Sequence, residues 1–208
     1  SRNYFHPEAG SRLFTYAADW LPALNPERSA ANFQSGELPL PPDWNRGGGK
    51  EQGLELAELL RFYRQAGADA VLAVSSTGEM LSLSWAEALQ LTRSASAMFG
   101  ARRTWASISC GRTVAACMEG AAELRVAGAG LPVVIPGLLA GAEFSEPEAL
   151  HRLLDVGRRA DGPLGLYEAL IPFHRTLPPA DLGTLARQGT YQLLKTTQGS
   201  PAKITALV

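Results

Sequence analysis

Two kinds of hydrophobic pattern alternate along the chain from residue 50 onward. The first kind is a short, continuous apolar run, and such runs cover residues 68–74, 104–110, 131–135, 164–167 and 191–195. Continuous runs are typical of β-strands that are buried on both faces, whereas strands with one face in water alternate apolar and polar residues. The pattern therefore predicts five buried strands.

The second kind of pattern is helical and fills the intervals between the runs. Segment 51–65 carries leucines at helical spacing and stops at Gly67. Ser84 and Glu87 form the signature of a capping box, in which the hydroxyl and the carboxylate each accept a hydrogen bond from a free backbone amide at the helix start. Further helices are expected over 113–126, 145–159 and 179–187, with one more opening at 200–201.

Strands and helices that alternate in this way form a parallel sheet with right-handed crossovers. Two architectures fit the pattern, an open doubly wound sheet and a (β/α)8 barrel. Both place their chemistry at the carboxyl ends of the strands, so candidate site residues are expected directly after the apolar runs.

Residues 1–49 do not follow this alternation. A first strand is expected near residues 12–18, and 25–49 is rich in Pro, Gly, Ser and Asn, which is typical of a loop. We therefore divide the chain into an N-terminal extension with a first strand and a loop, 1–49, and a (β/α) barrel portion that carries the candidate site, 50–208. The GGGK sequence at 47–50 lacks the spacing of a phosphate-binding loop and is interpreted as a linker.

Composition narrows the function classes. Of 208 residues, 46% are hydrophobic and 19% are charged, and the formal net charge is −1, which fits a globular chain and not a disordered one. Without an excess of basic residues, neither a nucleic acid nor a membrane is expected as a partner. No apolar run approaches the roughly 18–20 residues that span a bilayer.

The chain has two cysteines, Cys110 and Cys117, which is too few for a disulfide framework. They have no CxxC spacing and no neighbouring histidine, so no metal site is expected and both are interpreted as small buried apolar groups. Such cysteine usage fits a reducing cytoplasm.

Polar groups follow two of the apolar runs. The segment SSTGE at 75–79 can form a nest of amide and hydroxyl donors that holds a carboxylate, or it can be an ordinary strand-to-helix turn whose hydroxyls cap the backbone. Tyr167 ends the fourth run. It is either a packing ring with its hydroxyl in water or a group that transfers protons at the mouth of a barrel.

Lys195 is the strongest chemical signal in the sequence. The chain has sixteen arginines and three lysines, and Lys195 ends a buried run. An ammonium that points inward there loses hydration, which lowers its pKa from about 10.4 and makes the amine nucleophilic near neutral pH. The alternative is a lysine that extends outward into water at the sheet end. Lys50 and Lys203, in a loop and near the terminus, are not expected to be nucleophiles.

These segments resemble those of the dihydrodipicolinate synthase / N-acetylneuraminate lyase family. Its members are Schiff-base (β/α)8 barrels that act on pyruvate or related 2-oxo acids. Segment 75–79 matches the family's G-T/S-T-G-E stretch, and LSWAE at 83–87 resembles its L-S-x-x-E helix start. Tyr167 stands at the tyrosine of the family's Y-N-x-P segment, and KTTQG at 195–199 resembles its K-D/T-S/T-x-G segment. The separation of 28 residues from Tyr167 to Lys195 is also similar to the family's.

The resemblance implies a TIM (β/α)8 barrel and a lyase, namely an aldolase, synthase or dehydratase that works through a lysine Schiff base. Lys195 would attack the 2-oxo carbon, and Tyr167 would move protons to and from the substrate. Ser76 and Thr77 would hold the substrate carboxylate. The resemblance also implies no cofactor, a small-molecule 2-oxo acid as substrate, a homo-oligomer (dimer or tetramer) and a cytoplasmic location.

The sequence departs from the family at several positions. The family often reads P-Y-Y where PGL stands at 136–138, so a tyrosine that would serve a neighbouring subunit is missing. Glu168 replaces the usual asparagine, and Pro172 stands where dihydrodipicolinate synthase has an arginine, although His174 and Arg175 are close. These differences disfavour the aspartate-semialdehyde reaction and suggest another 2-oxo acid reaction or a decayed site.

The chain ends at Val208, where the resemblance leaves the barrel without its seventh and eighth strands. We therefore expect a TIM barrel truncated after the sixth strand, with apolar sheet edges that need cover.

Three hypotheses remain open from the sequence. The chain is a 2-oxo-acid lyase with Lys195 as nucleophile, or an inactive relative that binds a 2-oxo acid or a partner chain. The third is an open α/β domain whose segment 75–79 binds an anion.

Overall fold

The chain forms a seven-stranded sheet that is mostly parallel, in the order β1-β2-β7-β6-β5-β4-β3. The structure is a computed structural model, and it describes the backbone of residues 4–5, 12–15, 50–65, 67–76, 80–110 and 112–196. Side chains are described within these ranges from residue 56 onward, except at 170 and 171.

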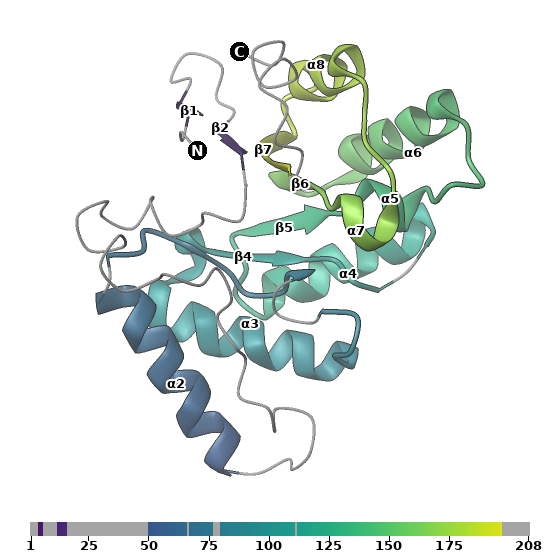
Figure 1. Cartoon of the computed structure of the whole chain (residues 1–208). Coiled ribbons are helices and arrows are strands. Elements are labelled where there is room, and N and C mark those ends of the chain that lie inside the picture. Colours follow the sequence, from purple (N-terminus) through teal and green to yellow (C-terminus); the bar gives the residue numbers. More distant parts are fainter. Residues whose placement is uncertain are drawn as a thin grey trace.

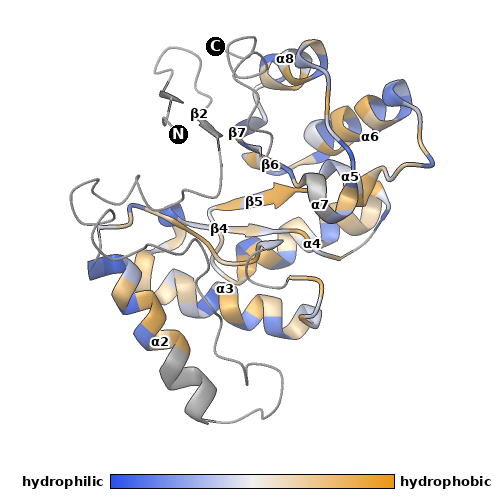
Figure 2. Ribbon diagram, viewed as in Figure 1, coloured by the Kyte–Doolittle hydropathy of each residue, from blue (hydrophilic) through white to orange (hydrophobic). Residues whose placement is uncertain are grey.

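Strands β3 to β7 lie within or overlap the five predicted apolar runs. The bounds of the strands are β1 Tyr4–Phe5, β2 Arg12–Thr15, β3 Val71–Leu72, β4 Thr104–Ser107, β5 Leu131–Val134, β6 Leu164–Glu168 and β7 Tyr191–Thr196. Strands β3 to β7 are parallel to their neighbours in chain order and form a half-barrel. Their residues are largely buried on both sides, as the continuous runs predicted (Figure 2).

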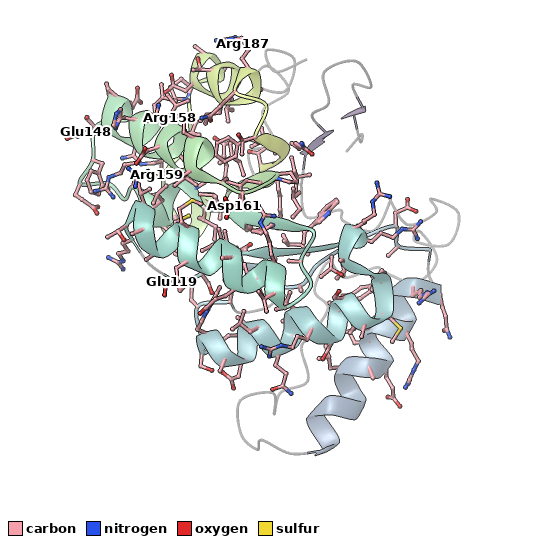
Figure 3. All side chains as sticks on the ribbon, turned by 180° about the vertical axis from the view of Figure 1, so that it is seen from behind. Glu119, Glu148, Arg158, Arg159, Asp161 and Arg187 are labelled. Atoms are coloured by element: carbon pink, nitrogen blue, oxygen red, sulfur yellow. The ribbon has the colours of Figure 1, made fainter. Side chains whose placement is uncertain are left out.

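Helices lie between the strands and cover one face of the sheet (Figure 1). They are α2 Lys50–Gln65, α3 Trp85–Phe99, α4 Val114–Val126, α5 Pro136–Leu139, α6 Glu146–Arg159, α7 Leu170–Phe173 and α8 Pro179–Arg187, with a short 3-10 helix at Ala101–Arg103. Figure 3 shows charged side chains of α6, such as Glu148 and Arg158, on the outside of this layer.

Two of the helix starts are fixed by capping boxes. Ser84 and Glu87 cap α3, as predicted, and Ser145 with Glu148 caps α6 in the same way. Each box satisfies amides at the helix start that have no partner within the helix. The capping boxes therefore begin both helices at the residues where the sequence placed them.

The half-barrel has a concave inner face and an outer face against the helices. Val71 and Ala73 pack with Leu56 and Leu60 of α2, so they face outward. Strand residues alternate between faces, which turns Leu72 and Val74 inward, into the main core cluster. This alternation decides which polar side chains meet inside.

Three features were not predicted. Strand β1 pairs antiparallel with β2, and the short helices α5 and α7 follow β5 and β6 directly. The expectation that both cysteines are buried is wrong for Cys110, which is half-buried, and correct for Cys117.

The expected first strand is present as β2, which pairs in parallel with β7. Most of 1–49 and the expected helix at 200–201 lie outside the described residues. The division at residue 50 and the truncation after the sixth strand therefore stay predictions.

Candidate active site

Lys195 lies near the carboxyl end of β7 and is 5% exposed. Burial lowers the pKa of its amine from 10.5 to about 7, because the charged form has lost its hydration. Of the two alternatives that the sequence left open for this lysine, the structure shows the buried one. Near neutral pH a large fraction of the amine is uncharged and carries a free electron pair.

Tyr167 is the neighbour of Lys195 on β6, in direct register with it. The Lys195 Nζ lies 3.8 Å from the centroid of the tyrosine ring. Burial raises the pKa of the Tyr167 hydroxyl, and its hydrogen bond with Ser76 acts in the opposite direction. The phenol is therefore protonated near neutral pH and can give a proton to a group beside the amine.

A β-bulge turns Lys195 to the same face as Tyr167. Leu164 pairs with Tyr191, but the next residue, Gly165, pairs with Leu193, so the register shifts by one residue at Gln192. Before the shift, the Tyr191 hydroxyl donates to the Leu153 carbonyl of α6 at 2.6 Å, on the outer face. Without the bulge, Lys195 would share that outer face, because residues four apart in a regular strand point the same way.

Ser76 reaches Tyr167 from the other side of the half-barrel. Its Oγ lies 2.7 Å from the Tyr167 Oη. Ser76 follows β3 and Tyr167 belongs to β6, and β4 and β5 separate the two strands in the sheet. A contact across two intervening strands requires the sheet to curve, so the strand ends converge on one small region.

The other residues singled out from the sequence lie elsewhere. Thr77, which was expected to hold the carboxylate with Ser76, lies outside the described residues, as does Lys203. Lys50 is the first residue of α2. The structure thus brings together Lys195, Tyr167 and Ser76.

Glu168 has a structural role that the sequence did not predict. Its side chain is fully buried, and Oε1 accepts a hydrogen bond from the Leu177 amide at 2.7 Å. This bond ties the end of the segment between β6 and α8 to the strand that carries Tyr167. The sequence signal that could have indicated this role is Glu168 itself, which stands where the family has an asparagine.

The segment after β6 packs against Gly137, in the stretch where the family often has tyrosines. A Cβ added at Gly137 would lie 2.5 Å from the Phe173 Cβ and 3.3 Å from the Arg175 Cβ. Arg175 donates from Nη2 to the carbonyls of Gly141, at 2.7 Å, and Phe144. The guanidinium therefore anchors the loop between α5 and α6.

No set of three or more His, Cys, Asp or Glu side chains is placed to hold a metal ion in the part of the chain that the structure describes. Within the same ranges, no helix is both long and apolar enough to cross a membrane.

Comparison with known proteins gives a clear result for the fold. No protein-family model and no curated protein matches the chain, whereas solved structures do. One is a putative dihydrodipicolinate synthase family protein from Coccidioides immitis, with 23% identity and a TM-score of 0.62 over 73% of this chain and 47% of that one. The fold is that of the dihydrodipicolinate synthase and N-acetylneuraminate lyase barrels.

Two further matches support the same assignment of fold. N-acetylneuraminate lyase from Mycoplasma synoviae is 18% identical, with a TM-score of 0.57 over 74% of this chain and 51% of that one. A prophage protein of the dihydrodipicolinic acid synthase family from E. coli K12, in complex with pyruvate, is 23% identical. Its TM-score is 0.61 over 73% of this chain and 50% of that one.

The resemblance stated from the motifs is confirmed, since the matched structures are dihydrodipicolinate synthase / N-acetylneuraminate lyase proteins. The chain spans about half the length of these solved structures.

Proposed function

We propose that this chain belongs to a Schiff-base lyase that acts on pyruvate or a related 2-oxo acid, with Lys195 as the nucleophile. The observation that carries the proposal is the buried Lys195 amine, whose pKa burial lowers to about 7, beside the ring of Tyr167. The complex of a structural neighbour with pyruvate supports a 2-oxo acid as the ligand.

The first step is carbon–nitrogen bond formation. The free electron pair of Lys195 attacks the 2-oxo carbon, and the carbonyl oxygen takes up a proton. Loss of that oxygen as water leaves an iminium between the lysine and the substrate. The protonated hydroxyl of Tyr167, whose ring lies against the Lys195 amine, is the group that supplies and recovers the protons.

The iminium then acts as an electron sink. Removal of a proton from C3, or cleavage of the C3–C4 bond, leaves an electron pair that flows toward the iminium nitrogen and gives an enamine. The Ser76 hydroxyl orients Tyr167 for these transfers. In this proposal, Ser76 and Thr77 also bind the substrate carboxylate, through their hydroxyl groups.

Reductive trapping tests the proposal. The chain is incubated with pyruvate and borohydride, which converts an iminium to a stable secondary amine, and the adduct is mapped by mass spectrometry. We expect the adduct on Lys195 and on neither Lys50 nor Lys203. The Lys195→Arg variant should give no adduct, because a guanidinium stays protonated. A folded native chain without an adduct contradicts the proposal, and an adduct without turnover of any aldol indicates an inactive binding relative.

The rate of trapping should depend on pH through the amine. Because burial lowers the Lys195 pKa to about 7, the rate of imine formation should rise with pH around a midpoint near 7. The measurement is the initial rate of adduct formation between pH 5.5 and 9. A midpoint near the pKa of an exposed lysine, about 10.4, would show that the reacting amine is not the buried one.

A further inference from the structure

We infer that Arg152 and Arg175 clamp the rim of the candidate site and thereby limit the size of the 2-oxo acid that reaches Lys195. The inference rests on the proposed function and adds a substrate class to it, the 2-oxo acids with a short substituent. Both arginines act as positioning residues, because each holds a segment of backbone in place.

The layer of side chains below the reactive amine is closely packed. Val133, Gly165 and Leu193 are neighbours across the sheet. Gly165 stands two residues before Tyr167 and shares its face, and Leu193 stands two residues before Lys195. A Cβ added at Gly165 would lie 3.0 Å from the Val133 Cγ2 and 3.2 Å from the Leu193 Cδ2. A substituent on C3 of a bound 2-oxo acid therefore extends outward, past the carboxyl ends of the strands.

The rim consists of the connections that follow β4, β5 and β6 at this end of the sheet. They comprise the backbone at Arg112 before α4, residues 136–144 and residues 169–177. The short helices α5 and α7 belong to the rim and lie side by side (Figure 1). Because parallel strands have their carboxyl ends at the same end of a barrel, the rim borders the space into which the substituent extends.

Arg152 of α6 joins two of these connections. Its Nη1 donates to the carbonyls of Arg112 and Leu139, at 3.1 Å each. The same guanidinium lies 3.9 Å from the centroid of the Phe144 ring, within the range of a cation–π contact. One half-buried side chain therefore ties the connection after β4 to the connection after β5.

Arg175 adds the connection after β6. Its Nη2 donates to the carbonyls of Gly141 and Phe144, so Phe144 is held at its ring by Arg152 and at its carbonyl by Arg175. The preceding residue, His174, has a φ of 52°, in the left-handed region that non-glycine residues rarely adopt. Strain of this kind persists where the surroundings hold the chain in one conformation. The clamp thus fixes all three connections.

A fixed rim limits the space for the substituent. In a pocket of fixed shape, one methylene changes selectivity by about 10–200-fold, whereas a rim that can move makes room for a longer chain. Arg152 and Arg175 therefore favour pyruvate over longer 2-oxo acids, although neither touches the substrate in this scheme.

Selectivity in reductive trapping tests the clamp in the full chain. Rates at low concentration are measured with pyruvate and with 2-oxopentanoate, and their ratio is the selectivity. We expect Arg152→Met and Arg175→Met each to lower the ratio about ten-fold. Phe144→Leu, which removes the ring and keeps an apolar side chain, should lower it as well. The control is Arg159→Met on the same helix, where Arg159 pairs with Asp155 at 2.8 Å, and it should keep the native ratio.

The outcomes separate this inference from the proposed function. The ratio cancels changes in the folded fraction and in the reactivity of Lys195, because both affect the two acids equally. A native ratio in both arginine variants overturns the inference and leaves the lysine chemistry intact. Equal losses of trapping with the two acids also overturn it, since they indicate a purely structural role. Absence of trapping with either acid in the native chain overturns the proposed function as well.

Discussion

The burial that lowers the pKa of the Lys195 amine also destabilises the folded chain. The unfolded chain keeps this amine hydrated and protonated up to about pH 10.4, whereas burial in the folded chain lowers its pKa to about 7. Between these values the unfolded state binds one more proton than the native state. The free energy of unfolding therefore rises with pH across this window as far as this group is concerned.

The Lys195→Met variant should consequently be more stable than the native chain at pH 7. Each unit of pKa depression corresponds to about 1.4 kcal/mol, so the gain should be a few kcal/mol. It should shrink as the pH rises from 7 toward 10.4, where the unfolded chain also loses the proton. Urea unfolding of both proteins at pH 7, 8 and 9 measures the difference, in which other titrating groups cancel. A difference that does not change with pH would contradict the burial of a neutral amine.

At the scale of elements, the sequence predicted the order of β3 to β7 and of the longer helices, because continuous apolar runs alternate with segments of helical spacing. The capping residues Ser84 and Ser145 also marked true helix starts. The bulge at Gln192 could not be predicted, because it depends on pairing with β6. The sequence left open whether Lys195 faces inward or outward, and the bulge is the reason that it faces inward.

The same limit applies to the candidate site. Lys195, Tyr167 and Ser76 could be singled out because each stands at a strand end. The role of Glu168 could not be predicted, because its hydrogen bond with the Leu177 amide forms only when the segment after β6 folds back on the strand. The helices α5 and α7 were missed because each has four residues, too few for a helical period to show.

Close packing of α5 on α7 makes Gly137 intolerant of substitution. In Gly137→Ala, the new Cβ would lie 2.5 Å from the Phe173 Cβ, so one of the two helices must move. Overpacking of this kind costs about 1–3 kcal/mol.

The control is Gly183→Ala in α8, whose Cβ would meet only the Arg187 Nη1 at 3.3 Å, the end of a flexible side chain. It should be neutral or stabilising by up to about 1 kcal/mol. Urea unfolding of the two variants measures both effects, and equal stabilities would contradict the packing argument.

At the scale of the whole molecule, the half-barrel brings together groups that are far apart in the sequence. The described helices cover the outer face of the sheet (Figure 1), and β5 is hydrophobic along its length (Figure 2). Within this apolar interior, the hydrogen bond between Ser76 and Tyr167 joins the ends of β3 and β6. The curvature of the sheet and the geometry of the candidate site therefore depend on each other.

A double-mutant cycle measures this dependence. Ser76→Ala, Tyr167→Phe and the double variant each remove the hydrogen bond, so the loss in the double variant should be smaller than the sum of the single losses. The difference should be about 1 kcal/mol, the usual net value of such a bond. The control pairs Ser76→Ala with Tyr191→Phe, whose hydroxyl bonds to Leu153 on the outer face; these losses should add within about 0.5 kcal/mol. If Ser76 and Tyr167 were also additive, the contact would not connect the two sides of the half-barrel in solution, and the site would lack the alignment that proton transfer through Tyr167 requires.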